Sequence, residues 1–152
     1  MYTHLEDYIR DLLKSISIQN PSDLNIENIA NRMHLIVTYK KKAFRHDNEI
    51  VLQPGTKQQE WRLFAHELCH YLRHYGNQLL MHKLFIDLQE YQANYFTYHF
   101  CVPTFMLDQL KEVTVDVIMN LFNVEHEFAF RRLEMYHSKT FERKMISARA
   151  YS

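Results

Sequence analysis

Apolar residues recur at intervals of three and four along much of the chain, which is the periodicity of amphipathic helices. In the first such stretch the recurring positions are Leu5, Tyr8, Ile9, Leu12, Leu13 and Ile16. The pattern predicts helices over residues 5–16, 26–33, 57–75, 84–101, 104–111, 114–122 and 125–137. Thr56 is a suitable N-cap for the third of these, because its hydroxyl can accept a hydrogen bond from a free backbone N–H. The periodicity weakens from Ser138 onward, so the remaining tail is expected to fray.

Two short apolar runs break the helical periodicity and predict β-strands. The first is Leu35–Tyr39 and the second is Glu49–Leu52, with a polar stretch between them. The sequence therefore predicts an α+β fold that is mainly helical and carries a small antiparallel sheet. We expect a single domain over residues 1–152, in which the N-terminal helix (residues 1–24) and a C-terminal helical segment (residues 112–152) are appendages.

The composition supports a helical domain with a core of its own. The chain has 152 residues, of which 47% are hydrophobic, and it has only two glycines and three prolines, which favours helices over a turn-rich β fold. The 18 basic and 18 acidic residues give a formal charge of zero, so electrostatics offer no argument for nucleic acid as a direct ligand. Proteins, peptides or small molecules are the expected partners.

The first residues, the apolar stretches and the cysteines indicate the cellular compartment. Residues 1–10 are polar and acidic without an apolar run behind them, and no stretch approaches the ~20 apolar residues of a membrane span. We therefore expect a cytoplasmic protein that does not contact membranes. In that compartment Cys69 and Cys101 are expected to be free thiols.

The most informative motif is H-E-x-x-H at residues 66–70. On a helix, positions i and i+4 lie ~40° apart around the axis and ~6 Å along it. His66 and His70 can therefore reach one metal ion, and Glu67 can contact a water on that ion without displacing it. The pattern thus supplies two ligands and one base.

The rest of this helix decides between a metal site and a chance match on a solvated surface. Apolar residues occupy the side opposite the two histidines: Trp61, Phe64, Ala65, Leu68, Leu72 and Tyr75. A helix with an apolar back and a His/Glu front is expected to pack on a core and face a cleft. The pattern favours a metal site over a surface helix.

A catalytic zinc usually takes three protein ligands, and three residues compete for the third position. His74 shares the face of the pair, but it lies ~12 Å along the axis from His66, too far for one ion on a straight helix. Cys69 points away from the pair and is better explained as a packing residue. Glu90 lies on the next long helix among core residues, where a carboxylate needs a strong partner, and is the preferred third ligand.

Asn94 follows Glu90 by four residues and shares its helix face. Ligating imidazoles usually donate their second N–H to an acceptor, which the Asn94 side-chain oxygen could provide. On spacing alone, Asn94 could equally be a polar residue at a packing edge. For the donor that stabilises a developing oxyanion, the candidates are His74, Tyr91, Tyr98 and His99, and the sequence does not select among them.

These motifs together resemble the ImmA/IrrE metallopeptidases. In that family H-E-x-x-H is followed by E-x-x-A-[ND]-x-F-A and a Leu-Met-Pro-like turn, and here residues 90–96 read E-Y-Q-A-N-Y-F, followed by Pro103. Thr97 stands where the family prefers Ala, and Cys69 stands where it usually has Gly. Both differences leave the two histidines intact, and the similarity covers most of residues 25–135.

The resemblance implies a zincin-like domain of the minimal gluzincin type, with one zinc ion per chain. It also implies the type encoded by phages and mobile elements, which cleaves a helix-turn-helix repressor and so relieves repression of the element. In the expected mechanism zinc activates water and polarises the scissile carbonyl, and Glu67 passes the water's proton to the leaving amine. The strand Glu49–Leu52 is expected to hold the substrate by strand addition, unless it only closes the domain.

Two non-catalytic functions compete with this interpretation. A DNA-binding module would use residues 114–137 as a helix-turn-helix, with Lys40–Lys42 as a basic patch, but glutamates offset the arginines there. A zinc-containing regulatory protein would bind and hold the repressor without cutting it. The presence of Glu67 argues against that second alternative.

Overall fold

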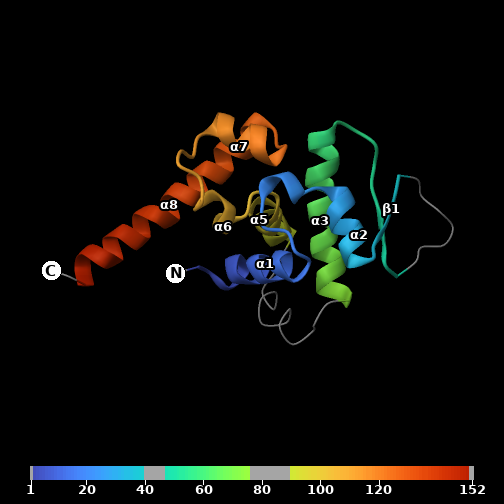
Figure 1. The fold of residues 1–152 in the computed structure, drawn as a ribbon, viewed down its shortest axis with the longest axis horizontal. Coiled ribbons are helices and arrows are strands. Elements are labelled where there is room, and N and C mark those ends of the chain that lie inside the picture. The colour runs from blue at the N-terminus through green and yellow to red at the C-terminus, as the bar shows by residue number, and fades with distance from the viewer. Residues whose placement is uncertain (1, 40–46, 76–89, 151–152) are drawn as a thin grey trace.

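Helix α3 (Lys57–Tyr75) runs through the middle of the molecule, with α2 (Ile26–Met33) and the strands on one side and α5 (Glu90–Cys101), α6 (Thr104–Leu107), α7 (Val115–Phe122) and α8 (His126–Ala150) on the other (Figure 1). The computed structural model describes residues 2–39, 47–75 and 90–150; of residues 74, 75, 90–92 and 139–150 it describes only the backbone. The other elements are α1 (His4–Ser15), the 3-10 helix η1 (Pro21–Asp23), β1 (Ile36–Thr38) and β2 (Glu49–Val51). This confirms a mainly helical α+β fold.

Side-chain caps begin several of these helices, and the cap at Thr56 is the one that the sequence predicts. The Thr56 hydroxyl accepts from the Gln59 N–H at 3.1 Å, and the Gln59 side chain accepts in return from the Thr56 N–H at 3.0 Å. This reciprocal arrangement satisfies two backbone donors at the start of α3. Thr3 and Glu6 form the same kind of capping box at the start of α1.

The two strands pair in parallel, so the expected antiparallel sheet is wrong. Ile36 is opposite Glu49 and Thr38 is opposite Val51, with both strands running in the same direction. A tight hairpin uses a loop of about two to five residues, whereas residues 39–48 connect these strands. A connection of that length is not restricted to the antiparallel geometry of a tight hairpin. β2 then packs against α3.

Aromatic rings fix α3 against α5. The Trp61 ring lies 6.1 Å from that of Phe64 and 6.0 Å from that of Phe100, and Phe96 stacks on Phe100 at 5.5 Å between centroids. All four side chains are buried. Such pairs add directional preference to the burial of apolar area, so they define how the two helices face each other.

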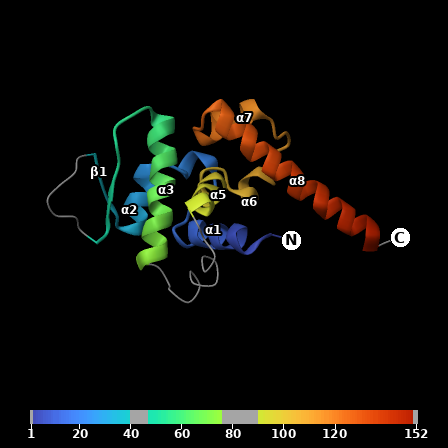
Figure 2. The ribbon, with the colours of Figure 1, turned by 180° about the vertical axis from the view of Figure 1, so that it is seen from behind.

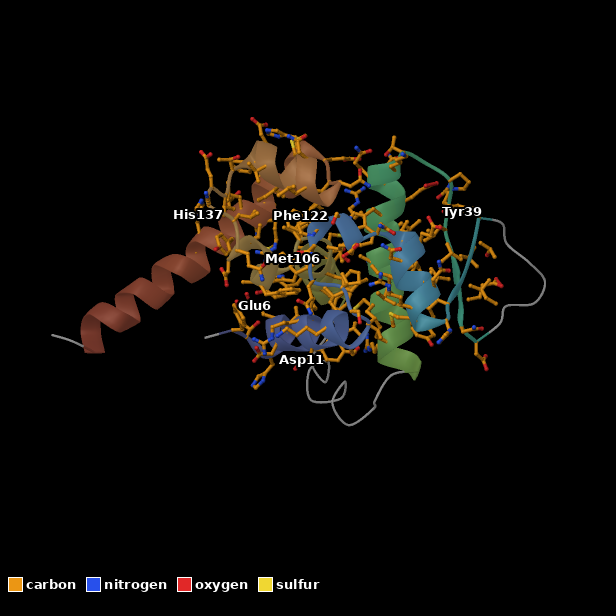
Figure 3. The ribbon with its side chains drawn as sticks, viewed as in Figure 1. Glu6, Asp11, Tyr39, Met106, Phe122 and His137 are labelled. Carbon is orange, nitrogen blue, oxygen red and sulfur yellow. The ribbon has the colours of Figure 1, made fainter. Side chains whose placement is uncertain are left out.

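Three buried polar side chains join helices that are distant in sequence, and we call Glu6, Thr104 and Arg132 the buried polar network (Figure 3 labels Glu6 on α1). The Arg132 guanidinium donates to the Val102 carbonyl at 2.9 Å and to the Thr104 hydroxyl at 2.9 Å. The Thr104 hydroxyl in turn donates to the Glu6 carboxylate. The network therefore ties α1, the start of α6 and α8 together.

Helix α8 is longer than predicted, because it continues to Ala150 and does not fray after Ser138. No glycine or proline follows Pro103 in the sequence, so nothing local terminates this helix. Its C-terminal half projects from the body of the molecule, as the two opposite views show (Figures 1 and 2). A projecting helix needs no apolar stripe, which explains why the periodicity is weak there. Within the described residues, no helix is long and apolar enough to span a membrane.

Candidate metal centre and adjoining cavity

The two faces of α3 differ as its sequence predicts. Its apolar back is fully buried at Trp61, Phe64, Ala65, Leu68 and Leu72. The three residues His66, Glu67 and His70, which we call the metal face, are half-buried on the other side of the helix. A rigid, well-packed back holds the imidazoles in place while their nitrogens stay accessible.

The two imidazoles of the metal face converge on one point. The Nε2 atoms of His66 and His70 lie 3.1 Å apart, and the ring centroids lie 4.8 Å apart at an interplanar angle of 75°. A tetrahedral ion ~2.0–2.1 Å from each nitrogen would hold them ~3.3 Å apart. The pair therefore fits a single ion after a shift of a few tenths of an ångström. Glu67 is the next position round the helix from His66, which suits a base beside the ion.

The register between α3 and α5 places the start of α5 beside this pair. Trp61 packs on Phe100, and His66 lines the same cavity as Asn94, so the two helices run antiparallel. Continuing that register by one turn brings the backbone of Glu90, the first residue of α5, level with His70. The side chain of Glu90 lies outside the described residues, as do those of His74 and Tyr91. Among the described side chains, no group of three or more His, Cys, Asp or Glu residues is suited to a metal.

A cavity of about 790 Å³ begins at His66 and extends towards the N-terminal half of α3. Its described lining comes from four parts of the chain: Gln53, Pro54 and Gly55 after β2; Gln59, Arg62, Leu63 and His66 on α3; Asn94, Thr97 and Tyr98 on α5; and Phe128 on α8. This volume is in the usual range of ligand clefts. The cavity can hold several side chains of a peptide next to the metal face.

Of the accessory residues predicted from sequence, Asn94 and Tyr98 line this cavity and His99 does not belong to its described lining. The Tyr98 ring stacks on Phe128 at 4.3 Å between centroids. His99 is only 2% exposed, and its Nδ1 lies 2.9 Å from the Tyr95 carbonyl oxygen. It lies close enough to Glu6 to affect that carboxyl electrostatically, so the structure places it with the buried polar network. Helix geometry explains the difference, because Tyr98 and His99 point ~100° apart.

Sequence reasoning missed Arg62 and Phe128 as cavity residues. Arg62 could have been found, because it precedes His66 by four residues and so shares its helix face. Phe128 carries no local signal, since only the packing of α8 against α5 brings it to the cavity. The C-terminal segment, expected to be an appendage, therefore supplies one wall of the cavity.

The remaining expectations concern the cysteines and basic residues. Cys69 and Cys101 form no disulfide, as predicted, and both are buried. Burial raises the pKa of the Cys101 thiol well above its usual range, so it stays protonated. Arg132, one of the arginines on the supposed helix-turn-helix, is 1% exposed and cannot contact DNA in this fold. Lys40–Lys42 lie outside the described residues.

Comparison with known proteins gives a consistent result. The family model described as the IrrE N-terminal-like domain, a peptidase family, matches residues 22–134. The chain is 38% identical over 148 residues to the phage-like element PBSX protein XkdA of Bacillus subtilis strain 168, covering 90% of this chain and 75% of that protein. It is 35% identical over 148 residues to the uncharacterized protein YqaB of the same strain, covering 90% and 86% of the two chains. No solved structure matches significantly.

Proposed function

The chain belongs to the IrrE N-terminal-like peptidase family, and on that premise we propose that it is a zinc-dependent, site-specific endopeptidase. Its substrate would be a helix-turn-helix repressor, and cleavage would relieve repression of a phage or mobile element. The observation that carries the proposal is the convergence of the His66 and His70 Nε2 atoms, 3.1 Å apart, at one end of a cavity large enough for a peptide.

His66, His70 and Glu90 would hold the zinc ion. The imidazole pair supports this assignment through its spacing. Glu90 is supported by the antiparallel register, which starts α5 level with His70, and by its spacing of four residues from Asn94, which reaches the cavity. A carboxylate from a second helix completes a His, His, Glu set and leaves one position open, as catalytic zinc requires.

The bound ion supplies Lewis acidity and activates water at neutral pH. Glu67 takes the proton of the attacking water and transfers it to the leaving amine. Asn94 and His66 line the same cavity, which supports a role for the Asn94 side-chain oxygen in orienting a ligating imidazole. Among the described side chains, Tyr98 is the best candidate for an oxyanion donor, because its ring stacks on Phe128.

Two observations support a repressor of a mobile element as the substrate. The relative XkdA is named as a protein of a phage-like element, and it covers most of this chain. The cavity is bordered by residues 53–55, which follow β2 directly, so an extended segment of substrate can continue from the cavity along the sheet.

The decisive test is Glu67→Gln, which keeps the size of the side chain but removes its ability to accept a proton. Cleavage of a helix-turn-helix repressor from the same element should fall by ~10²–10⁴-fold. Zinc content and melting temperature should stay near wild type, because Glu67 is not a ligand. Measurements of cleavage by mass spectrometry and of metal by elemental analysis check both statements.

The same variant separates catalysis from binding. If Glu67→Gln relieves repression in cells as well as wild type does, hydrolysis is not the working mechanism. A non-catalytic zinc protein that holds the repressor would then take its place. Wild type that cleaves the repressor and a variant that only binds it would support the peptidase.

A further inference from the structure

The cavity beside the metal face has a distinctive distribution of charge. Among its described lining residues, Arg62 is the only arginine or lysine, and none is an aspartate or glutamate. Gln53, Gln59 and Asn94 add amide groups but no net charge. A segment that enters this cavity therefore meets one guanidinium without an anion built in to neutralise it.

Arg62 itself is exposed and available. Within the described part of the chain it takes part in no ion pair, although Glu125 and Arg62 border the same small hollow next to the cavity. The adjacent Trp61 ring lies 6.0 Å from that of Phe100 on α5, and the Arg62 guanidinium acts electrostatically on the neighbouring Cys101 thiol. Arg62 thus lies near the C-terminal end of α5 and one helical turn before His66 on α3.

The distance from the metal face sets which part of a peptide Arg62 can reach. Arg62 precedes His66 by four residues, which is ~6 Å along the helix axis. In an extended peptide, side chains on the same side recur every two residues, or ~6.6 Å. A peptide bond positioned at the metal face would therefore present the side chain about two residues away to Arg62. Leu63 and the Tyr98–Phe128 stack give the same cavity apolar lining.

We propose that Arg62 is a specificity-determining residue that binds an Asp or Glu side chain of the substrate about two residues from the scissile bond. The preferred substrate is thus a peptide segment with an acidic side chain at that position and an apolar side chain nearer the cut. Arginine suits this role because its planar guanidinium binds carboxylates with two parallel hydrogen bonds. The proposal rests on the peptidase function proposed above, since it takes the metal face as the origin of the cleft.

The test uses the zinc-loaded full-length Glu67→Gln protein to select binders from a randomised library of short peptides. A second selection uses Glu67→Gln combined with Arg62→Glu, and a third uses Glu67→Gln combined with Arg131→Glu. Arg131 is a matched control, because it is an exposed arginine that forms a surface pair with Glu134 at 3.8 Å and does not line the cavity within the described residues. Melting curves check that each variant is folded. Arg62→Gln is a second variant that removes the charge of Arg62 without reversing it.

We expect the first and third selections to enrich Asp or Glu at one position, and the second to enrich Lys or Arg there. Replacing that acidic residue by its amide in a selected peptide should weaken binding by about 10–100-fold in the parent and leave Arg62→Gln nearly unaffected. Identical profiles with Arg62 and with Glu at position 62 would overturn the proposal, and so would the absence of any enriched acidic position.

The binding selection is independent of hydrolysis. If wild type cleaves no peptide while the selection depends on residue 62 as described, the peptidase function fails and the specificity site stands. If wild type cleaves the repressor and Arg62→Glu cleaves the same bond at the same kcat/KM, the specificity site fails and the peptidase function stands.

Discussion

Two clusters of polar side chains lie in the helical body. One is buried and its members hydrogen-bond to each other, whereas the other presents two imidazole nitrogens beside a cavity. In the buried polar network, Arg132, Thr104 and Glu6 form a chain of donors and acceptors that reaches the Val102 carbonyl. In the metal face, two imidazole nitrogens approach each other to 3.1 Å beside an open cavity. The first cluster is 1–5% exposed, whereas the second is half-buried.

The difference distinguishes a structural cluster from a functional one. A buried charge is tolerated where neighbouring groups satisfy it, as they do for Arg132. Two nitrogens that face one point are better satisfied by an external ion than by each other, since only one proton can lie between them. The buried polar network should therefore govern stability, and the metal face should govern zinc binding and activity.

The largest expected effect tests the metal face. His66→Ala, His70→Ala and Glu90→Ala should each lower the zinc content from about one per chain to near zero, because each removes one of three ligands. His74→Ala should retain zinc, since that side chain lies too far along the helix. Elemental analysis after dialysis measures the zinc content per chain. A site emptied by His74→Ala and kept by Glu90→Ala would identify a different third ligand.

The next effect tests the buried polar network. Arg132→Ala should lower the free energy of unfolding by about 3–5 kcal/mol, because it leaves the Glu6 carboxylate without its cationic neighbour and opens a void. The zinc content of the folded fraction should not change. Denaturant unfolding of the metal-free protein measures the loss. Arg131→Ala is the control on the adjacent residue, and its exposed pair with Glu134 should contribute less than about 1 kcal/mol. Equal losses in both variants would contradict the comparison.

The third prediction concerns the effect of metal removal on the melting temperature in variants of each cluster. A chelator should lower the melting temperature of wild type, since an ion that binds only the folded state at 100 times its Kd stabilises it by about 2.7 kcal/mol. The chelator should leave His70→Ala unchanged, whereas Arg132→Ala should still respond to it. Differential scanning calorimetry with and without the chelator checks this. An equal chelator response in wild type and His70→Ala would show that the metal binds elsewhere.

The smallest effect concerns pH and Glu6. Burial alone raises the pKa of this carboxyl, but hydrogen bonds from Thr104 and Thr3 and the nearby His99 outweigh it, so the pKa lies below its ordinary value of 4.5. In the unfolded chain the carboxyl takes up its proton first as the pH falls. The stabilising contribution of Glu6 is therefore complete above about pH 5 and is lost as the pH drops through the folded-state pKa.

This loss can be measured on the metal-free protein between about pH 5 and pH 3. Glu6→Gln should be less stable than wild type at neutral pH, and its stability should fall less steeply over that interval. Glu27→Gln, at an exposed acidic position on α2, should follow the wild-type slope. Parallel curves for wild type and Glu6→Gln would show that this carboxyl does not titrate with folding.

Local periodicity was enough to predict most elements and the two faces of α3. The spacing of apolar residues on α3 correctly separated its buried back from the side that carries His66, Glu67 and His70, because a helix repeats the same geometry at every turn. Capping by Thr56 followed from side-chain chemistry within one turn. Neither inference needed information from elsewhere in the chain.

Tertiary structure decided the features that depend on contacts between distant segments. Whether β1 and β2 pair in parallel depends on the path of residues 39–48, which hydrophobic alternation does not encode. Whether a polar residue on a helix faces a cavity or a buried partner depends on which element packs against it. Tyr98 reached the cavity and His99 did not because α8 lies against one side of α5 and Glu6 of α1 against another. The sequence thus determined the chemistry of the metal face, and only the packing of α1, α5 and α8 decided which other side chains surround it.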